Sequence, residues 1–224
     1  NLLIILISLA VQLPLALALA VLLAERIRGA YTFRMIFFLP YVLAEIAAGL
    51  IWRFVYDGDY GLVASLTNWL GYPPVHLLAD RELAIYGVLA VVVWKYFGFH
   101  MILYLAGLQG IPPELEDAAR VDGATPSRVL RDITLPLLGP TIRVSAFFAV
   151  LGSLQFFDLI WVMTKGGPVN ESNTMATYMY TYGFQRFQLG YGAAVSLVIF
   201  VICFGFSLAY QRFVMRRDLE GALT

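Results

Sequence analysis

Long apolar runs constrain this chain more than any other feature of its sequence. A helix needs roughly 20 apolar residues to cross the hydrocarbon core of a bilayer, and five stretches qualify. Because main-chain polar groups in lipid must bond to one another, each stretch predicts a helix and not an open strand. The expected spans are Leu2–Ala24, Met35–Tyr56, Leu83–Leu108, Leu137–Met163 and Tyr191–Phe213. The sequence predicts an all-α, polytopic transmembrane bundle that forms one domain over residues 1–224.

Composition agrees with a membrane environment. Hydrophobic residues make up 60% of the chain and charged residues 13%, whereas soluble domains average about 45–50% and about 25%. The formal net charge is zero, so nothing suggests a nucleic-acid partner. The single cysteine, Cys203, lies in an apolar run and cannot form an internal disulfide.

The distribution of basic residues predicts the orientation of the spans, because cytoplasmic connections carry the excess of Lys and Arg. Nine basic residues fall in the first and third connections and the tail: Arg26, Arg28, Arg34, Arg120, Arg128, Arg131, Arg212, Arg216 and Arg217. The other two connections hold three: Arg81, Lys165 and Arg186. The first, third and tail segments are therefore expected in the cytoplasm and Asn1 outside. One more helix before Asn1 would give six spans, so we expect an N-terminal span to be missing.

The third connection, residues 109–136, has clear helix signals. Pro113 suits a first helical position, and the carboxylates that follow it suit the positive end of a helix dipole. This helix should run to about Val121, and Gly123 can stop it with an unusual φ. Thr125 then caps a second short helix that has Pro126 at its first position. The loop is expected to form a helix, a tight turn and a helix.

The spacing in this loop resembles the EAA loop of ABC-importer permeases. The family pattern is Glu-Ala-Ala, three residues, Gly, nine residues, Ile, one residue and Leu-Pro. Asp in place of Glu is the single departure here, and it keeps the charge. The matching positions are Asp117, Ala118, Ala119, Gly123, Ile133, Leu135 and Pro136.

The resemblance implies that the first short helix docks on a separate cytoplasmic ATPase subunit, of which an importer has two. The small Ala118 and Ala119 would allow close approach, and Asp117, with Glu116, would offer a carboxylate. Asp122 belongs to the same expected coupling segment, and Gly123 would set the angle between the helices. Neither Lys95 nor Lys165 sits in a phosphate-binding loop. We therefore expect no catalytic site and no cofactor in this chain, with ATP and Mg bound by the ATPase partners.

Further segments resemble the carbohydrate-uptake, maltose-type branch of these permeases. They are Phe38-Leu39-Pro40, Ala106–Pro112, Phe157-Asp158, Thr164–Pro168 and Gly190–Ala194. The resemblance implies a multi-pass protein of the bacterial inner membrane that pairs with a second permease subunit, as a heterodimer. It also implies an extracytoplasmic substrate-binding protein and a sugar, an oligosaccharide or related polyol, as substrate.

Polar residues at membrane depth are costly, so each is a candidate for the substrate path. Tyr41 and Glu45 are four residues apart and are expected on one helical face. Aromatic and small residues continue the expected path on two other spans. The expected path residues are Tyr41, Glu45, Trp94, Phe97, Gly98, Met101, Gly152, Ser153, Phe156 and Asp158.

Other interpretations of these residues and of the chain stay open. Trp94, Phe97 and Met101 could equally pack against neighbouring helices, and Gly98 could simply allow close helix approach. Lys95 could pair with Glu45 or Asp158. The chain could also be an ion-coupled secondary transporter or a non-catalytic assembly subunit. His76 and His100 have no partners at metal-ligand spacing, so no metal site is expected.

Overall fold

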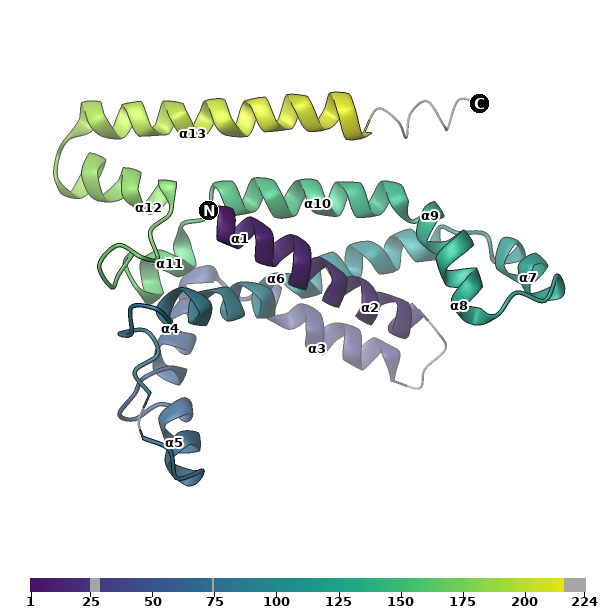
Figure 1. The fold of residues 1–224 in the computed structure, drawn as a ribbon, viewed down its shortest axis with the longest axis horizontal. Coiled ribbons are helices and arrows are strands. Elements are labelled where there is room, and N and C mark those ends of the chain that lie inside the picture. The colour runs from purple at the N-terminus through teal and green to yellow at the C-terminus, as the bar shows by residue number, and fades with distance from the viewer. Residues whose placement is uncertain (25–28, 74, 216–224) are drawn as a thin grey trace.

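In the computed structural model of the protein, which describes residues 1–24, 29–73 and 75–215, all regular elements of these residues are helical. Three continuous stretches are long and apolar enough to cross a membrane. They confirm the first, third and fifth expected spans (Figure 1). They consist of α1 (Leu2–Ile7) with η1 (Ser8–Gln12) and α2 (Leu13–Ala24), α6 (Ala84–Gln109), and α13 (Leu189–Tyr210) with η4 (Gln211–Met215). Four arginines that enter the orientation argument lie outside the described residues: Arg26, Arg28, Arg216 and Arg217.

The second expected span, Met35–Tyr56, is not one helix. It divides into α3 (Ala30–Val42) and α4 (Glu45–Val55), which are bent by 97°. Pro40 lies inside α3 and has no N–H to donate, which weakens the helix shortly before it ends. The two residues at the break, Leu43 and Ala44, have ψ of 137° and cannot continue a helix. The apolar run is real, but its second half turns away from the first.

Lys95 of α6 closes the broken end of α3. Its Nζ donates to the carbonyl oxygens of Leu43 at 2.6 Å and of Pro40 and Tyr41 at 3.4 Å each. The last carbonyls of a helix lack partners within that helix, and a cation near them is favourable. The side chain is 1% exposed. Lys95 therefore caps the main chain, and it forms no ion pair with Glu45 or Asp158, the alternative that the sequence left open.

The fourth expected span, Leu137–Met163, is also shorter than predicted. Its continuous part is α10 (Gly139–Leu154), about 24 Å long at 1.5 Å per residue. A short turn follows, and α11 (Asp158–Met163) then packs against α4. At its other end α10 is bent by 64° from the helical segment Pro126–Leu137, which comprises α8 (Pro126–Val129), η2 (Leu130–Thr134) and α9 (Leu135–Leu137).

Two shorter segments lie on the side that is expected to be external. The first contains a turn at Asp57, whose Oδ1 accepts the N–H groups of Tyr60 and Asp59 at 2.9 and 3.0 Å. These bonds, that of Tyr60 first, lower the pKa of Asp57. A short helix, α5 (Leu62–Trp69), follows the turn. Further on, α12 (Met175–Tyr180) and η3 (Thr181–Gln185) lead into α13.

Helix α6 is the centre of the bundle. It contributes residues to both hydrophobic clusters and packs against α2, α3 and α10. The approach of α3 is very close, because a Cβ added to Gly98 would lie 2.0 Å from the carbonyl oxygen of Phe37. One side of α6 is therefore filled by α3. The remaining side is free to contribute to a cavity.

Candidate functional site

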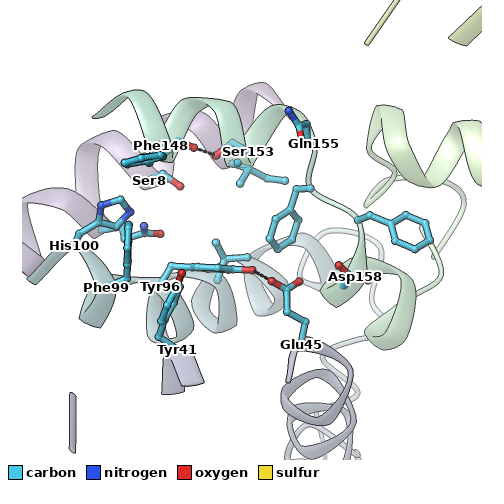
Figure 2. Close-up of a pocket in the computed structure, with 17 residues that line it drawn as sticks. Ser8, Tyr41, Glu45, Tyr96, Phe99, His100, Phe148, Ser153, Gln155 and Asp158 are labelled. Carbon is cyan, nitrogen blue, oxygen red and sulfur yellow. Dashed lines mark hydrogen bonds between the residues drawn. The ribbon is translucent and has the colours of Figure 1, made fainter. Parts of the chain in front are cut away.

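A cavity of about 400 Å³ opens among the spans (Figure 2). This volume lies within the range of roughly 300–1,000 Å³ that is usual for small-molecule sites. The residues around it come from four stretches of the sequence. The lining consists of Ile4, Ser8, Gln12, Tyr41, Glu45, Val92, Tyr96, Phe99, His100, Phe148, Ala149, Gly152, Ser153, Gln155, Phe156, Phe157 and Asp158.

The loop between α6 and α10, with α7 and α8, lies at one end of the bundle (Figure 1), whereas the cavity is lined by other parts of the helices. The cavity takes the first part of the N-terminal span, the break between α3 and α4, the middle of α6, and the end of α10 with the turn into α11. The loop follows the far end of α6. With Asn1 outside, as the basic residues predict, the cavity lies in the outer half of the membrane.

Aromatic rings form much of the cavity wall. The rings of Tyr41 and Phe99 are stacked with centroids 4.9 Å apart. Phe148 meets the edge of Phe99 at 6.1 Å, and Phe156 meets that of Tyr96 at 6.2 Å. These contacts hold the rings at fixed angles around the cavity. The wall offers flat apolar faces that a ligand with C–H surfaces can pack against.

Polar groups are placed between these rings. The hydroxyl of Tyr96 donates to Oε1 of Glu45, and Asp158 faces Glu45 from the start of α11 (Figure 2). The Nδ1 of His100 lies 2.7 Å from Oγ of Ser145 on α10, so the imidazole joins two helices of the wall. Gln12 is 2% exposed, and its Oε1 has no hydrogen-bond partner. A buried acceptor without a partner is costly unless a ligand or water supplies a donor.

The cavity brings together six of the ten predicted path residues, from two stretches of the chain. They are Tyr41, Glu45, Gly152, Ser153, Phe156 and Asp158. The prediction that Tyr41 and Glu45 share a helical face was wrong, because the helix breaks between them. Both reach the cavity because the 97° bend turns the start of α4 inward. Whether substrate passes here stays a prediction.

The other four predicted path residues do not line the cavity. Trp94 packs edge to face on Trp52, with centroids 5.2 Å apart, and Phe97 packs on Phe37 at 5.8 Å. Met101 is fully buried in the core, and Gly98 is the close contact with α3. At 3.6 residues per turn, positions 94 and 98 lie about 200° around α6 from Tyr96. The four predicted path residues of α6 therefore lie on the face of the helix that packs against its neighbours, opposite the cavity.

Several cavity residues were not predicted. The cavity face of α6 consists of Val92, Tyr96, Phe99 and His100, spaced at helical period. Tyr96 and His100, four residues apart, are polar rings in an apolar span and were the available signal. Ser8 and Gln12 form a second polar pair at the same spacing in the first span. Phe148 carried no signal beyond its aromatic character.

The loop forms the predicted helix, turn and helix. Helix α7 covers Pro113–Val121 with Pro at its first position and two carboxylates in its first turn. Gly123 has a φ of +84°, the left-handed conformation that glycine adopts without strain. Pro126 begins α8 as expected, but the Thr125 side chain makes no capping bond to the main chain. Its hydroxyl lies 3.2 Å from that of Ser127 instead.

Glu116 ties the two parts of the loop together. Its Oε1 accepts the hydroxyl of the buried Thr134 at 2.9 Å, and its Oε2 lies 3.2 Å from Arg120. Arg120 also bonds to Asp117 at 2.9 Å. The Asp117 side chain is 69% exposed, so it stays accessible to a partner, whereas Glu116 is engaged inside the loop.

The outer face of α7 is uncovered by the described part of the chain. None of its residues is buried, and Val121 is 88% exposed. Leu115, Ala118 and Val121 follow one another at three-residue spacing and expose a small apolar strip on one face. Among the other expected coupling residues, Ala119, Ile133 and Leu135 are half-buried, and Asp122, Gly123 and Pro136 are exposed. The described residues contain no group of three His, Cys, Asp or Glu side chains that could hold a metal.

Comparisons with known proteins agree with this architecture. Residues 12–218 match the family described as "Binding-protein-dependent transport system inner membrane component". A trehalose/maltose transport system permease protein of Thermococcus litoralis is 33% identical over 92% of this chain and 70% of its own length.

Two solved structures are similar as well. One is of a bacterial ABC transporter involved in the import of the acidic polysaccharide alginate, with a TM-score of 0.84 and 25% identity. It covers 95% of this chain and 77% of its own. The other is the alginate transporter in complex with an alginate pentasaccharide-bound periplasmic protein, with a TM-score of 0.87 and 26% identity. It covers 96% of this chain and 76% of its own.

Proposed function

The chain belongs to the family of inner-membrane components of binding-protein-dependent transport systems, and from this premise we propose that it passes a sugar through the cavity around Tyr96. It is a multi-pass permease subunit of an ABC importer of the inner membrane. The expectation of an ABC-importer permease is thereby confirmed. The ion-coupled and assembly-subunit alternatives have no support in this family membership.

The aromatic cavity is the observation that carries the sugar proposal. Sugars present apolar C–H faces that pack on aromatic rings and hydroxyls that bond to polar groups. Here Tyr41, Phe99 and Phe156 supply rings, while Gln12 and Glu45 supply acceptors. The similarity to a trehalose/maltose permease and to alginate importers supports the same substrate class.

The open side of the cavity supports a second permease subunit. Phe148, Gly152, Gln155 and Asp158 line the cavity and are nevertheless exposed. We place a second permease subunit, in a heterodimer, over this side, so that the path lies between the two subunits. An extracytoplasmic binding protein would deliver the sugar at the outer end. The alginate transporter, solved with its periplasmic protein, supports that partner.

Coupling to ATP is assigned to the outer face of α7. The exposed strip of Leu115, Ala118 and Val121, with the carboxylate of Asp117 beside it, suits a cleft with apolar and basic groups. Two cytoplasmic ATPase subunits would bind ATP and Mg, one of them on this loop. The hydrogen bond from Thr134 to Glu116 would transmit a displacement of α7 to the helical segment that leads into α10.

We assign no nucleotide site or catalytic role to the chain itself. Lys95 is buried and bonded to main-chain carbonyls, so it is not available to a phosphate. Lys165 lies beyond α11, at the end of the bundle that is expected to be external. The energy for transport would come from the ATPase partners.

The coupling proposal is tested by purifying the chain together with its ATPase subunits. Ala119→Trp places a bulky ring on the docking helix, and we expect it to abolish co-elution with the ATPase and substrate-stimulated ATP hydrolysis. Leu62→Trp, on the exposed face of α5, is a matched control that should change neither. Normal co-elution of Ala119→Trp would contradict docking on α7.

The sugar path is tested separately in proteoliposomes with the binding protein present. Tyr96→Leu removes the hydroxyl that positions Glu45, and Phe99→Ala removes a wall ring. Both should lower sugar uptake at least about tenfold, the loss expected for roughly 1.4 kcal/mol of binding, while the complex still assembles. Unchanged uptake in both variants would show that the path is elsewhere.

A further inference from the structure

The charged side chains that line the cavity are both acidic. Two carboxyl groups, Glu45 at the start of α4 and Asp158 at the start of α11, face each other at its edge (Figure 2). They interact electrostatically, and the Tyr96 hydroxyl bonds to Glu45. A ligand in the cavity meets carboxyl oxygens.

No basic side chain offsets this inside the cavity. None of the lining residues is Lys or Arg, and the ring of His100 is buried and bonded to Ser145. Lys95 is close enough to act on Glu45, but it is 1% exposed and its Nζ points to the carbonyl oxygens of Leu43, Pro40 and Tyr41. Its ammonium group therefore donates to the main chain and does not reach a ligand in the cavity, although its charge still acts on Glu45.

Gln12 provides an independent sign that the cavity receives a ligand with hydroxyl donors. It lines the cavity from η1, and its side chain is buried, with 2% exposure. Its Oε1 has no partner. A buried acceptor is satisfied by an O–H donor, and it is left unsatisfied by another acceptor such as a carboxylate oxygen.

We propose that the cavity selects uncharged sugars and excludes anionic ones, with Glu45 and Asp158 as the residues that set this specificity. The proposal rests on the sugar path proposed above. Uncharged sugars bring hydroxyl donors to the carboxyl groups and to Gln12. A uronic acid or a phosphorylated sugar brings like charge and unmatched acceptors to the same oxygens. Family likeness leaves the choice open, because similar proteins include a trehalose/maltose permease and an importer of the acidic polysaccharide alginate.

The test uses the complete transporter complex in lipid nanodiscs without its binding protein, so that only the membrane site selects. Binding of matched probes is measured by equilibrium dialysis: trehalose against trehalose 6-phosphate, and methyl glucoside against methyl glucuronide. We expect the wild type to bind each uncharged probe at least about tenfold more tightly than its anionic match, a modest effect for like charges near a protein surface. Equal or tighter binding of the anionic probes overturns the charge selection.

Variants assign the selection to its residues. The double variant Glu45→Gln with Asp158→Asn removes the charge at nearly constant shape. It should reduce the ratio of affinities for the uncharged and the anionic probe to about twofold or less. Asp158→Asn alone should reduce this ratio by a smaller amount. Gln12→Leu should weaken the binding of both probes of a pair and leave the ratio of their affinities unchanged. Glu171→Gln, on the surface beside Arg81, is the control for charge alone and should change nothing. An unchanged ratio in the double variant overturns the assignment to this pair.

The two proposals fail in different ways. If the wild type binds none of the four probes and Phe99→Ala also leaves sugar uptake intact, the sugar path is wrong and the inference falls with it. If uptake depends on Phe99 while the anionic probes bind as well as their uncharged matches, the sugar path stands and only the charge selection is wrong.

Discussion

The cavity and the loop between α6 and α10 are separate regions of one bundle, and the protein builds them in different ways. The loop is local: α7, the turn at Gly123 and α8 follow one another within 17 residues, Pro113–Val129. The cavity joins residues as far apart as Ile4 and Asp158. Its wall exists only when helices α3, α4, α6 and α10 are packed and bent as observed.

The two regions of the molecule require glycine for different reasons. Gly123 needs no space, because nothing lies within 4 Å of an added Cβ, but its φ of +84° requires glycine. Gly98 has ordinary helical conformation, but α3 leaves no room for a side chain there. One glycine serves a local conformation and the other a tertiary contact. Substitutions at the two sites should therefore fail for different reasons.

The largest effect is expected at the tertiary contact. Gly98→Ala would place its Cβ against the main chain of Phe37, which cannot yield as a side chain would. We expect the stability to fall by about 3 kcal/mol, the upper end of overpacking effects, measured as a lower midpoint of thermal unfolding in detergent. Gly205→Ala, with open space around it in α13, is the control and should be neutral. An unaffected Gly98→Ala would contradict the close packing of α3 on α6.

The cap on α3 should rank next. Lys95→Met keeps the length and volume of the side chain but leaves the carbonyl oxygen of Leu43 and its neighbours without their donor. The expected loss is about 1–3 kcal/mol, again by thermal unfolding, together with weaker sugar binding because the break positions Tyr41 and Glu45. Lys95→Gln retains an N–H donor and should lose less. Equal stability of Lys95→Met and the wild type would show that the bend needs no cap.

A smaller and local effect is expected in the loop. Gly123→Ala forces a side chain into the left-handed conformation, at a cost of about 1–2 kcal/mol, which can be relieved by shifting the turn. We expect little change in the unfolding midpoint but a clear drop in sugar-stimulated ATP hydrolysis by the assembled complex. Gly110→Ala, at a glycine with ordinary φ of −82°, should retain activity. Full activity of Gly123→Ala would mean that the angle of α7 is not critical.

The smallest effect is expected for the hydrogen bond between Thr134 and Glu116, which ties the two parts of the loop together. Thr134→Val keeps the shape of the side chain but removes the hydrogen bond to Glu116, for a loss of about 0.5–1.5 kcal/mol. Faster hydrogen exchange of the α7 amides, with an unchanged global midpoint, is the measurement. Thr125→Val removes a hydroxyl that bonds only to Ser127 and serves as the control. Equal hydrogen exchange of the α7 amides in Thr134→Val and Thr125→Val would show that the bond to Glu116 does not stabilise α7.

The sequence predicted the two regions to unequal extents. The loop followed from Pro113, Gly123 and Pro126, because each residue restricts its own backbone. The cavity was predicted in part, since its charged members stand out in apolar spans, but the α6 residues predicted for the path lie on another face of that helix. Periodicity offers both the face of Trp94 and that of Tyr96 as candidates. It contains no information on which face another helix will cover, although Gly98 on the first was a sign of close packing.

By itself the sequence determined the helical membrane fold, the place of the loop between two spans and the residues that turn it. These depend on length, apolar character and local backbone restrictions, which act within a few residues. Only the tertiary structure decided that α3 ends at Val42, that Lys95 caps it, and that Glu45 and Asp158 meet across a cavity. Such features depend on contacts between segments more than fifty residues apart, and neither periodicity nor propensity encodes which distant groups a buried polar side chain will find.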